Sequence, residues 1–140
     1  MAANTIPIFC DSGNMLPVSL GTTANTASDG SGTIVTLVTA NADGTRVDGV
    51  TITNAQASPA ASSAMRINIF LSDVAGANFR LIGQGVMASA TRSNTVLGSS
   101  VTITFAQPII MRSGQLIGIC QSVYAGAQDL NHGIAFANDY

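Results

Sequence analysis

Apolar and polar residues alternate along much of the chain with a period of two, as in a β-strand with one buried face. In the clearest example, residues 64–72, every second side chain is apolar: Met65, Ile67, Ile69 and Leu71. We expect these four to face a core and Arg66, Asn68 and Phe70 to face outward. A large aromatic side chain is unfavourable to leave in water, so Phe70 is predicted to be covered by another protein, either a second copy of this chain or a different partner. Arg66, on the same outward face, is a candidate for the same interface.

Similar patterns predict about eight short strands, separated by turns rich in Gly, Asn, Asp and Ser. They are expected at residues 5–9, 33–40, 46–53, 64–72, 79–86, 100–105, 115–123 and 133–138. The last of these has Ile134 and Phe136 as its large apolar residues. Strands at this spacing, without helical patterns between them, favour an all-β fold: a single-domain antiparallel β-sandwich that is jelly-roll-like.

The turn between residues 33–40 and 46–53 contains Asp43-Gly44, which is a strong signal for a β-hairpin. We therefore expect these two strands to pair with each other. Two glycines, in Gly83-Gln84-Gly85, lie inside another predicted strand. Glycine at such a position is typical of a bulge or of a close approach by other residues.

The first part of the chain has a different character. Residues 10–32 are rich in Gly, Ser, Asn and Thr and predict a long loop. The chain thus divides into an N-terminal arm and loop, residues 1–32, and a β-sandwich domain, residues 33–140. Pro7 places the strand at residues 5–9 on an edge or in an arm. Ile6, Ile8 and Phe9 are therefore candidates for adding a strand to a partner.

Composition supports the all-β prediction and favours assembly over chemistry. The 140 residues include no Lys and no Glu, the residue types that commonly cover exposed helices, and only 9% are charged. The five arginines are spread along the sequence, whereas nucleic-acid binding requires clustered positive charge. No apolar run is long enough to span a membrane. We expect neither nucleic acid nor membrane as a partner, and folding in a cytoplasm.

Candidate catalytic and metal-binding residues are few. The single histidine, His132, has only Asp129 as a nearby carboxylate, and no serine has the surroundings of an activated nucleophile. Asp43 and Asp48 come closest to a calcium loop, but a turn explains Asp43-Gly44 more simply. We expect no enzyme activity, metal or cofactor. Cys10 and Cys120 are expected to be unbridged thiols, because no secretion signal precedes them.

The N-terminal residues Ala3-Asn4-Thr5-Ile6-Pro7-Ile8-Phe9, the stretch 22–33 continuing through Asp43-Gly44-Thr45-Arg46-Val47, and the C-terminal Asp139-Tyr140 together resemble small virion proteins of tailed bacteriophages. The resemblance extends to residues 65–71 and 111–123 and is thin between 88 and 98. It implies a capsid decoration, or cement, protein with a jelly-roll-like sandwich. It also implies homotrimers on the outer shell, the major capsid protein as partner and no catalytic residues.

The sequence thus predicts a virion structural protein that is made in the host cytoplasm and stabilises the assembled head. The alternative is a carbohydrate-binding jelly roll associated with the phage tail. Sugar sites usually present aromatic platforms, and this chain has no Trp and only two Tyr and five Phe. Composition therefore favours the first function over the second.

Overall fold

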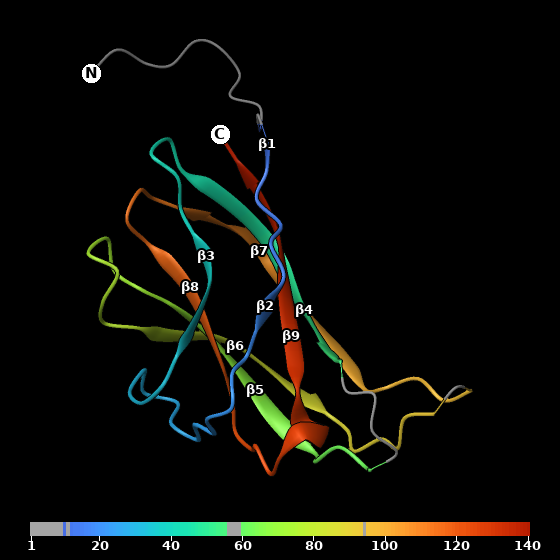
Figure 1. Ribbon diagram of the computed structural model, residues 1–140. Helices are drawn as coiled ribbons and strands as arrows, with labels where there is room; N and C mark the ends of the chain where they lie inside the picture. The colour runs from blue at the N-terminus through green and yellow to red at the C-terminus, as the bar shows by residue number, and fades with distance from the viewer. Residues whose placement is uncertain (1–9, 11, 56–59, 94) are drawn as a thin grey trace, which may run out of the picture.

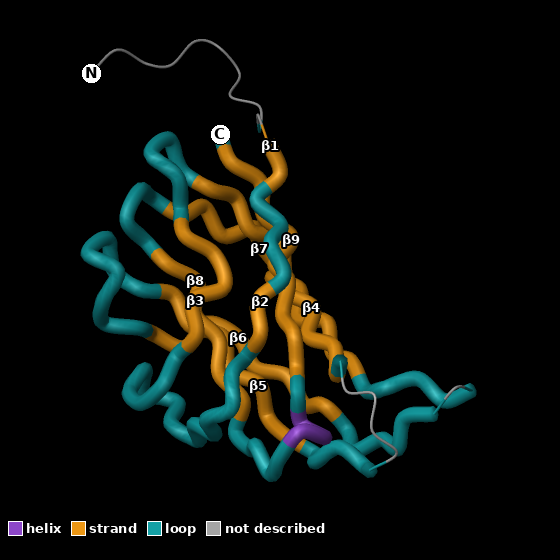
Figure 2. Tube along the Cα trace, in the orientation of Figure 1, coloured by secondary structure: helices purple, strands orange, loops and turns teal. Residues whose placement is uncertain are grey.

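The computed structural model describes residues 10, 12–55, 60–93 and 95–140 (Figure 1). Two antiparallel sheets pack face to face, and a short 3-10 turn, Ala127–Asp129, is the only helical element in this part of the chain (Figure 2). The strands are β1 (Ser12–Gly13), β2 (Val18–Ser19), β3 (Val35–Thr39), β4 (Thr45–Asn54), β5 (Met65–Leu71), β6 (Arg80–Met87), β7 (Ser100–Met111), β8 (Leu116–Gln121) and β9 (Asn131–Asp139).

The strand order is that of a jelly roll. Sheet A has the order β1-β9-β4-β7, with β2 also paired to β9, and sheet B has the order β3-β8-β5-β6. β1 and β2 follow β9 in one register, since Ser12 pairs with Asp139 and Ser19 with His132. They are therefore two pieces of one edge strand, and the described part of the sandwich has eight strands when they are counted together. The predicted single-domain antiparallel β-sandwich is confirmed.

Seven of the eight predicted strands are present, and the eighth, at residues 5–9, lies outside the described residues. The predicted long loop at residues 10–32 differs from the structure, because it contains β1 and β2. Pro17 lies between these two pieces, and a proline cannot donate a backbone hydrogen bond to a neighbouring strand.

The predicted hairpin around Asp43-Gly44 is wrong. β3 pairs with β8 in sheet B, whereas β4 pairs with β7 and β9 in sheet A. The turn is nevertheless tight: the Asn41 side-chain oxygen accepts hydrogen bonds from the Asp43 amide at 2.7 Å and the Gly44 amide at 3.2 Å, and Gly44 has φ 108°. The local sequence specifies a sharp turn, but this turn carries the chain from one sheet to the other.

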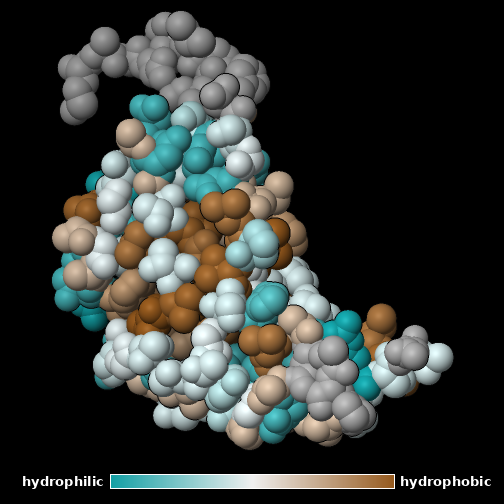
Figure 3. Space-filling model, in the orientation of Figure 1, coloured by the Kyte–Doolittle hydropathy of each residue, from teal (hydrophilic) through white to brown (hydrophobic). Residues whose placement is uncertain are grey.

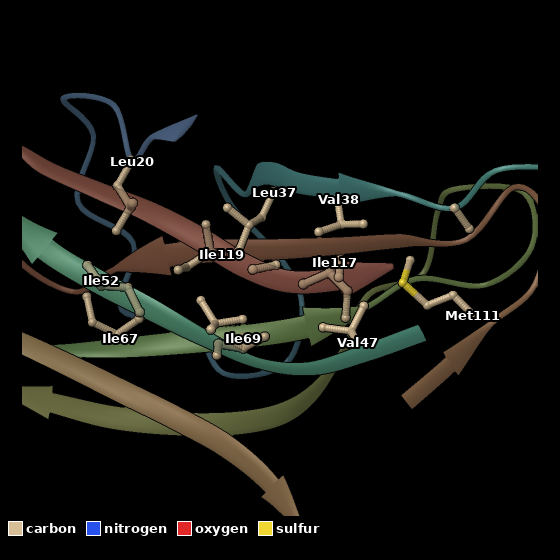
Figure 4. Packing of buried hydrophobic residues seen from close by; sticks show 14 of the residues in the cluster. Leu20, Leu37, Val38, Val47, Ile52, Ile67, Ile69, Met111, Ile117 and Ile119 are labelled. Carbon is tan, nitrogen blue, oxygen red and sulfur yellow. The ribbon is translucent and has the colours of Figure 1, made fainter. Parts of the chain in front are cut away.

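The core lies between the sheets, and branched aliphatic side chains fill it (Figure 4). Sheet A contributes Val47, Val50 and Ile52, and sheet B contributes residues that include Ile67 and Ile119. Strict alternation would place Val47 and Val50 on opposite faces. The register of β4 shifts between Val47 and Gly49, which brings both valines inside.

The glycines of β6 lie where another strand approaches closely, as the sequence predicts. A Cβ atom at Gly85 would lie 2.8 Å from the Ile103 Cδ1 atom, and one at Gly83 would lie 3.4 Å from both Ile103 and Phe105. Side chains of β7 thus pack directly onto the backbone of β6, and larger residues there would force the two sheets apart.

Candidate interaction surfaces

Phe70 is fully buried within one subunit, so the prediction that a partner must cover it is wrong. Phe70 pairs with Gly118 of β8 and does not belong to the main core cluster between the sheets. A Cβ atom on Gly118 would overlap Ile34 Cγ2 and lie 2.8 Å from Phe79 Cε1. Residues of the same chain therefore pack over the outer face of sheet B at this position.

The covering segment is residues 21–34, and polar side chains of β5 fasten it. The Arg66 guanidinium donates a hydrogen bond to the Thr26 carbonyl at 2.8 Å, and the Asn68 amide donates one to the Ala27 carbonyl at 3.0 Å. Asn68 also accepts a hydrogen bond from Gln84 at 2.8 Å. The Arg66 Nε atom is buried without a hydrogen-bond partner. Arg66 thus makes a contact within its own chain, whereas the sequence predicts that it lies in an interface.

The other interface candidates, Ile6, Ile8 and Phe9, lie outside the described residues. The structure shows a different candidate surface, which the sequence did not predict. We call it the sheet A face: the outward-facing side chains of β9, β4 and β7. Phe136 is 39% exposed and Ile110 is 57% exposed on this face, while Ala135 and Ala137 fill the inward positions of β9.

The sheet A face is nearly neutral. At its centre the Thr51 and Thr102 hydroxyl groups share a hydrogen bond of 2.8 Å. Towards one end Arg46 and Asp48 form an ion pair of 2.8 Å, which offsets their charges. The Asp48 side chain also raises the pKa of Arg46. A neutral face with exposed apolar side chains is suited to contact with another protein surface.

A second feature projects from the sandwich where β4 ends and β7 begins (Figure 1). We call it the projection: residues 60–64 and 88–99 in the described part of the chain. Its two segments are joined by a bridge between Ala61 and Thr91 and by a 3.0 Å hydrogen bond from the Ser62 amide to the Ala90 carbonyl. Near its tip, Val96 is 50% exposed and Leu97 is 88% exposed.

Two open hollows, of about 320 and 290 Å³, adjoin the loop before β6 and share Asn78 and Arg80 in their walls. Asp73 lines the first, and hydrogen bonds from the Asn78 side chain and then the Ala77 amide lower its pKa. Asp29 lines the second, and hydrogen bonds from the Ser31 hydroxyl and amide lower its pKa. Both carboxylates are thus engaged by their own loops.

Asp129 is buried and clamps a turn. It accepts hydrogen bonds from the Ser63 amide at 2.7 Å, the Ser63 hydroxyl at 2.9 Å and the Ala125 amide at 2.8 Å. Its two oxygens are thus used by structural donors, and His132 lies exposed on the sheet A face. In the described residues no three His, Cys, Asp or Glu side chains gather closely enough to hold a metal ion.

Both cysteines are free, which confirms the prediction that they are unbridged. Cys10 is exposed and Cys120 is buried. Burial raises the pKa of the Cys120 thiol, partly offset by Asn68 and Arg66. The thiol points at the Asn25 carbonyl, 3.5 Å away, and so lies beneath the segment that covers sheet B.

No helix among the described residues is long and apolar enough to cross a membrane. Comparisons of the chain with models of known protein families, with curated proteins and with solved structures find no match.

Proposed function

We propose that this protein is a bacteriophage virion protein that decorates the head, binds the outer surface of the major capsid protein lattice and stabilises it. The resemblance of the N-terminal and 22–47 sequences to small virion proteins motivates the proposal. The observation that carries it is the sheet A face, which leaves Phe136 and Ile110 exposed on a framework of paired strands. Such a face suits a broad contact with protein better than it suits a small ligand.

The size of the face bears on the mechanism. β9 has nine residues, and at about 3.3 Å per residue and about 4.8 Å between strands, the three strands of this face cover roughly 430 Å². A stable interface of ordinary size needs about 800 Å² on each partner. One copy would therefore bind weakly, and several linked copies on one lattice would bind strongly, because each later contact is intramolecular. Binding only to the assembled lattice stabilises that lattice by mass action.

The direct test is to add the purified protein to capsids that lack it and to measure binding by cosedimentation. We expect saturable binding and a higher temperature of capsid disruption. A lack of saturable binding to any capsid state would overturn the proposal. Binding to a glycan array with labelling of phage tails in electron micrographs would instead support the carbohydrate-binding alternative.

The contact surface is tested by placing one charge on each side of the sandwich. Thr51→Arg adds a long cation at the centre of the sheet A face, and Val86→Arg adds one on β6, where Val86 is 73% exposed. We expect Thr51→Arg to weaken capsid binding by at least tenfold, and Val86→Arg to leave it unchanged. Equal binding by both variants would reject the sheet A face while leaving capsid binding itself intact.

A further inference from the structure

Near the tip of the projection, the exposed side chains of Val96 and Leu97 form an apolar knob on a hydrogen-bonded stem. Leu97 is the most exposed large apolar side chain in the described residues, at 88%. The stem is held at its base by a 2.9 Å hydrogen bond from the Asn54 amide to the Ser99 carbonyl, and Gly98 packs against Asn54. The exposure of Leu97 is thus maintained by backbone contacts that fix the stem to the end of β4.

A second apolar surface lies at the side of the sandwich where residues 14–21 approach β3. These segments meet at two places: the Asn14 amide donates a 3.3 Å hydrogen bond to the Thr39 carbonyl, and Gly21 approaches Val35. Between these places apolar side chains reach the surface, as Figure 3 shows. We call this surface the open edge; it comprises the exposed Met15 and Leu16 and the half-buried Val18 and Val35.

One molecule cannot bring its own knob to its own open edge. The projection leads directly into β7, and the order β1-β9-β4-β7 places β7 at the opposite edge of sheet A from β1 and β2. Residues 12–20 and 33–39 contain no charged residue, and Arg92 is the only one at 60–64 and 88–99. Contact between the two surfaces would therefore desolvate little charge.

These observations lead to one arrangement. We propose that the projection of one copy binds the open edge of a second copy, head to tail, and that successive contacts close a ring. About sixteen described residues form the projection, and at roughly 30 Å² per residue they bury about 500 Å² on each partner, less than a stable dimer needs. Closure of a ring gives every subunit two such contacts and makes the last one intramolecular.

The test needs only the purified protein, so its outcome is separate from that of capsid binding. Sedimentation velocity of the wild type should show an assembly larger than a dimer that dissociates on dilution. Leu97→Asp and Leu16→Asp should each shift the protein to the 14.2 kDa monomer, whereas Val86→Asp, at another exposed apolar position, should not. A monomeric wild type at the highest soluble concentration, or an assembly unaffected by Leu97→Asp, would overturn the inference.

Mixing the variants distinguishes a head-to-tail contact from a symmetric one. Leu97→Asp keeps an intact open edge and Leu16→Asp keeps an intact projection, so an equal mixture can form one contact but cannot close a ring. We therefore expect a weak dimer at the highest concentrations and nothing larger. Cysteine trapping gives an independent readout in a Cys10→Ser background. When an external oxidant such as copper phenanthroline is added, a disulfide should join Leu97→Cys to Leu16→Cys across two chains. Trapping of Leu97→Cys with itself at equal efficiency would contradict the head-to-tail arrangement.

Discussion

The outer faces of the two sheets differ in how far the chain itself covers them. On sheet B the chain covers its own face: residues 21–34 lie over β5 and β8, and Phe70 is completely buried. On sheet A the corresponding aromatic, Phe136, lies over Gly49 and keeps 39% of its surface in solvent. Both faces carry a phenylalanine in an outward position, but among the described residues only the face of sheet B is covered by its own chain.

This difference changes the meaning of an outward aromatic residue. On sheet B it marks a second, smaller apolar cluster, and the polar groups of Arg66 and Asn68 bond the segment above them. On sheet A, Phe136 pairs with Gly49 of β4, and Gly49 pairs in turn with Thr104 of β7. Neither residue is large enough to enclose an aromatic ring. Among the described residues, the face that remains uncovered is therefore the outer face of sheet A.

The largest expected effect comes from comparing the two aromatic residues directly. Phe70→Ala should destabilise the protein by about 3 to 5 kcal/mol, because it opens a cavity under the covering segment. Phe136→Ala should cost about 1 kcal/mol or less, because its ring is partly in solvent already. Urea denaturation of the two variants measures both values. Equal losses of stability would show that the two faces do not differ in the way described.

The packing of the cover onto sheet B is tested at Gly118. A methyl group there would overlap Ile34 Cγ2 and approach Phe79. Gly118→Ala should therefore cost about 1 to 3 kcal/mol through overpacking. Adding Ile34→Ala should relieve part of this cost, so that the double variant is less destabilised than the sum of the two single variants. Strict additivity in thermal or urea unfolding would show that Ile34 does not press on this glycine.

The contrast also shows what the sequence could and could not predict. Alternation in β5 correctly identified Ile67 and Ile69 as core residues and Phe70 as outward-facing with respect to sheet B. It could not identify the cover, because the contact of Arg66 with Thr26 joins residues 40 positions apart. Long-range contacts of this kind leave no periodic signal in the strand itself.

The sheet A face was missed for a related reason. In β9 the large residues Ile134 and Phe136 face outward and the small residues Ala135 and Ala137 face inward. The inner side of β9 is crowded: a Cβ atom at Gly133 would already lie 3.3 Å from Leu20 and 3.4 Å from Leu37. Small residues are needed there, so residue size is a misleading guide to the buried face. The alternation of large and small residues is visible in the sequence, but only the position of the opposing sheet shows which of the two faces is buried.

A smaller effect is expected when the polar attachment of the cover is removed. Asn68→Ala eliminates the hydrogen bonds to Ala27 and from Gln84, and should cost about 1 to 2 kcal/mol. The matched change on the other face is Thr51→Val, which removes only the exposed hydrogen bond to Thr102 and should cost under about 0.5 kcal/mol. Urea denaturation distinguishes these values, and equal costs would show that Asn68 does not hold the cover.

The smallest expected effect is a local response to acid, confined to the covering segment. Asp29 lies in this segment, and hydrogen bonds from Ser31 lower its pKa below the ordinary 3.8. The folded state therefore favours the ionised carboxylate: this contribution is complete above pH 3.8 and is lost as the pH falls through the lowered pKa. Hydrogen exchange at the Ser31 amide should accelerate below pH 3.8, relative to its intrinsic rate, while the β4 amides remain protected. Asp29→Ala should abolish the pH dependence, and its persistence in that variant would assign the response to another group.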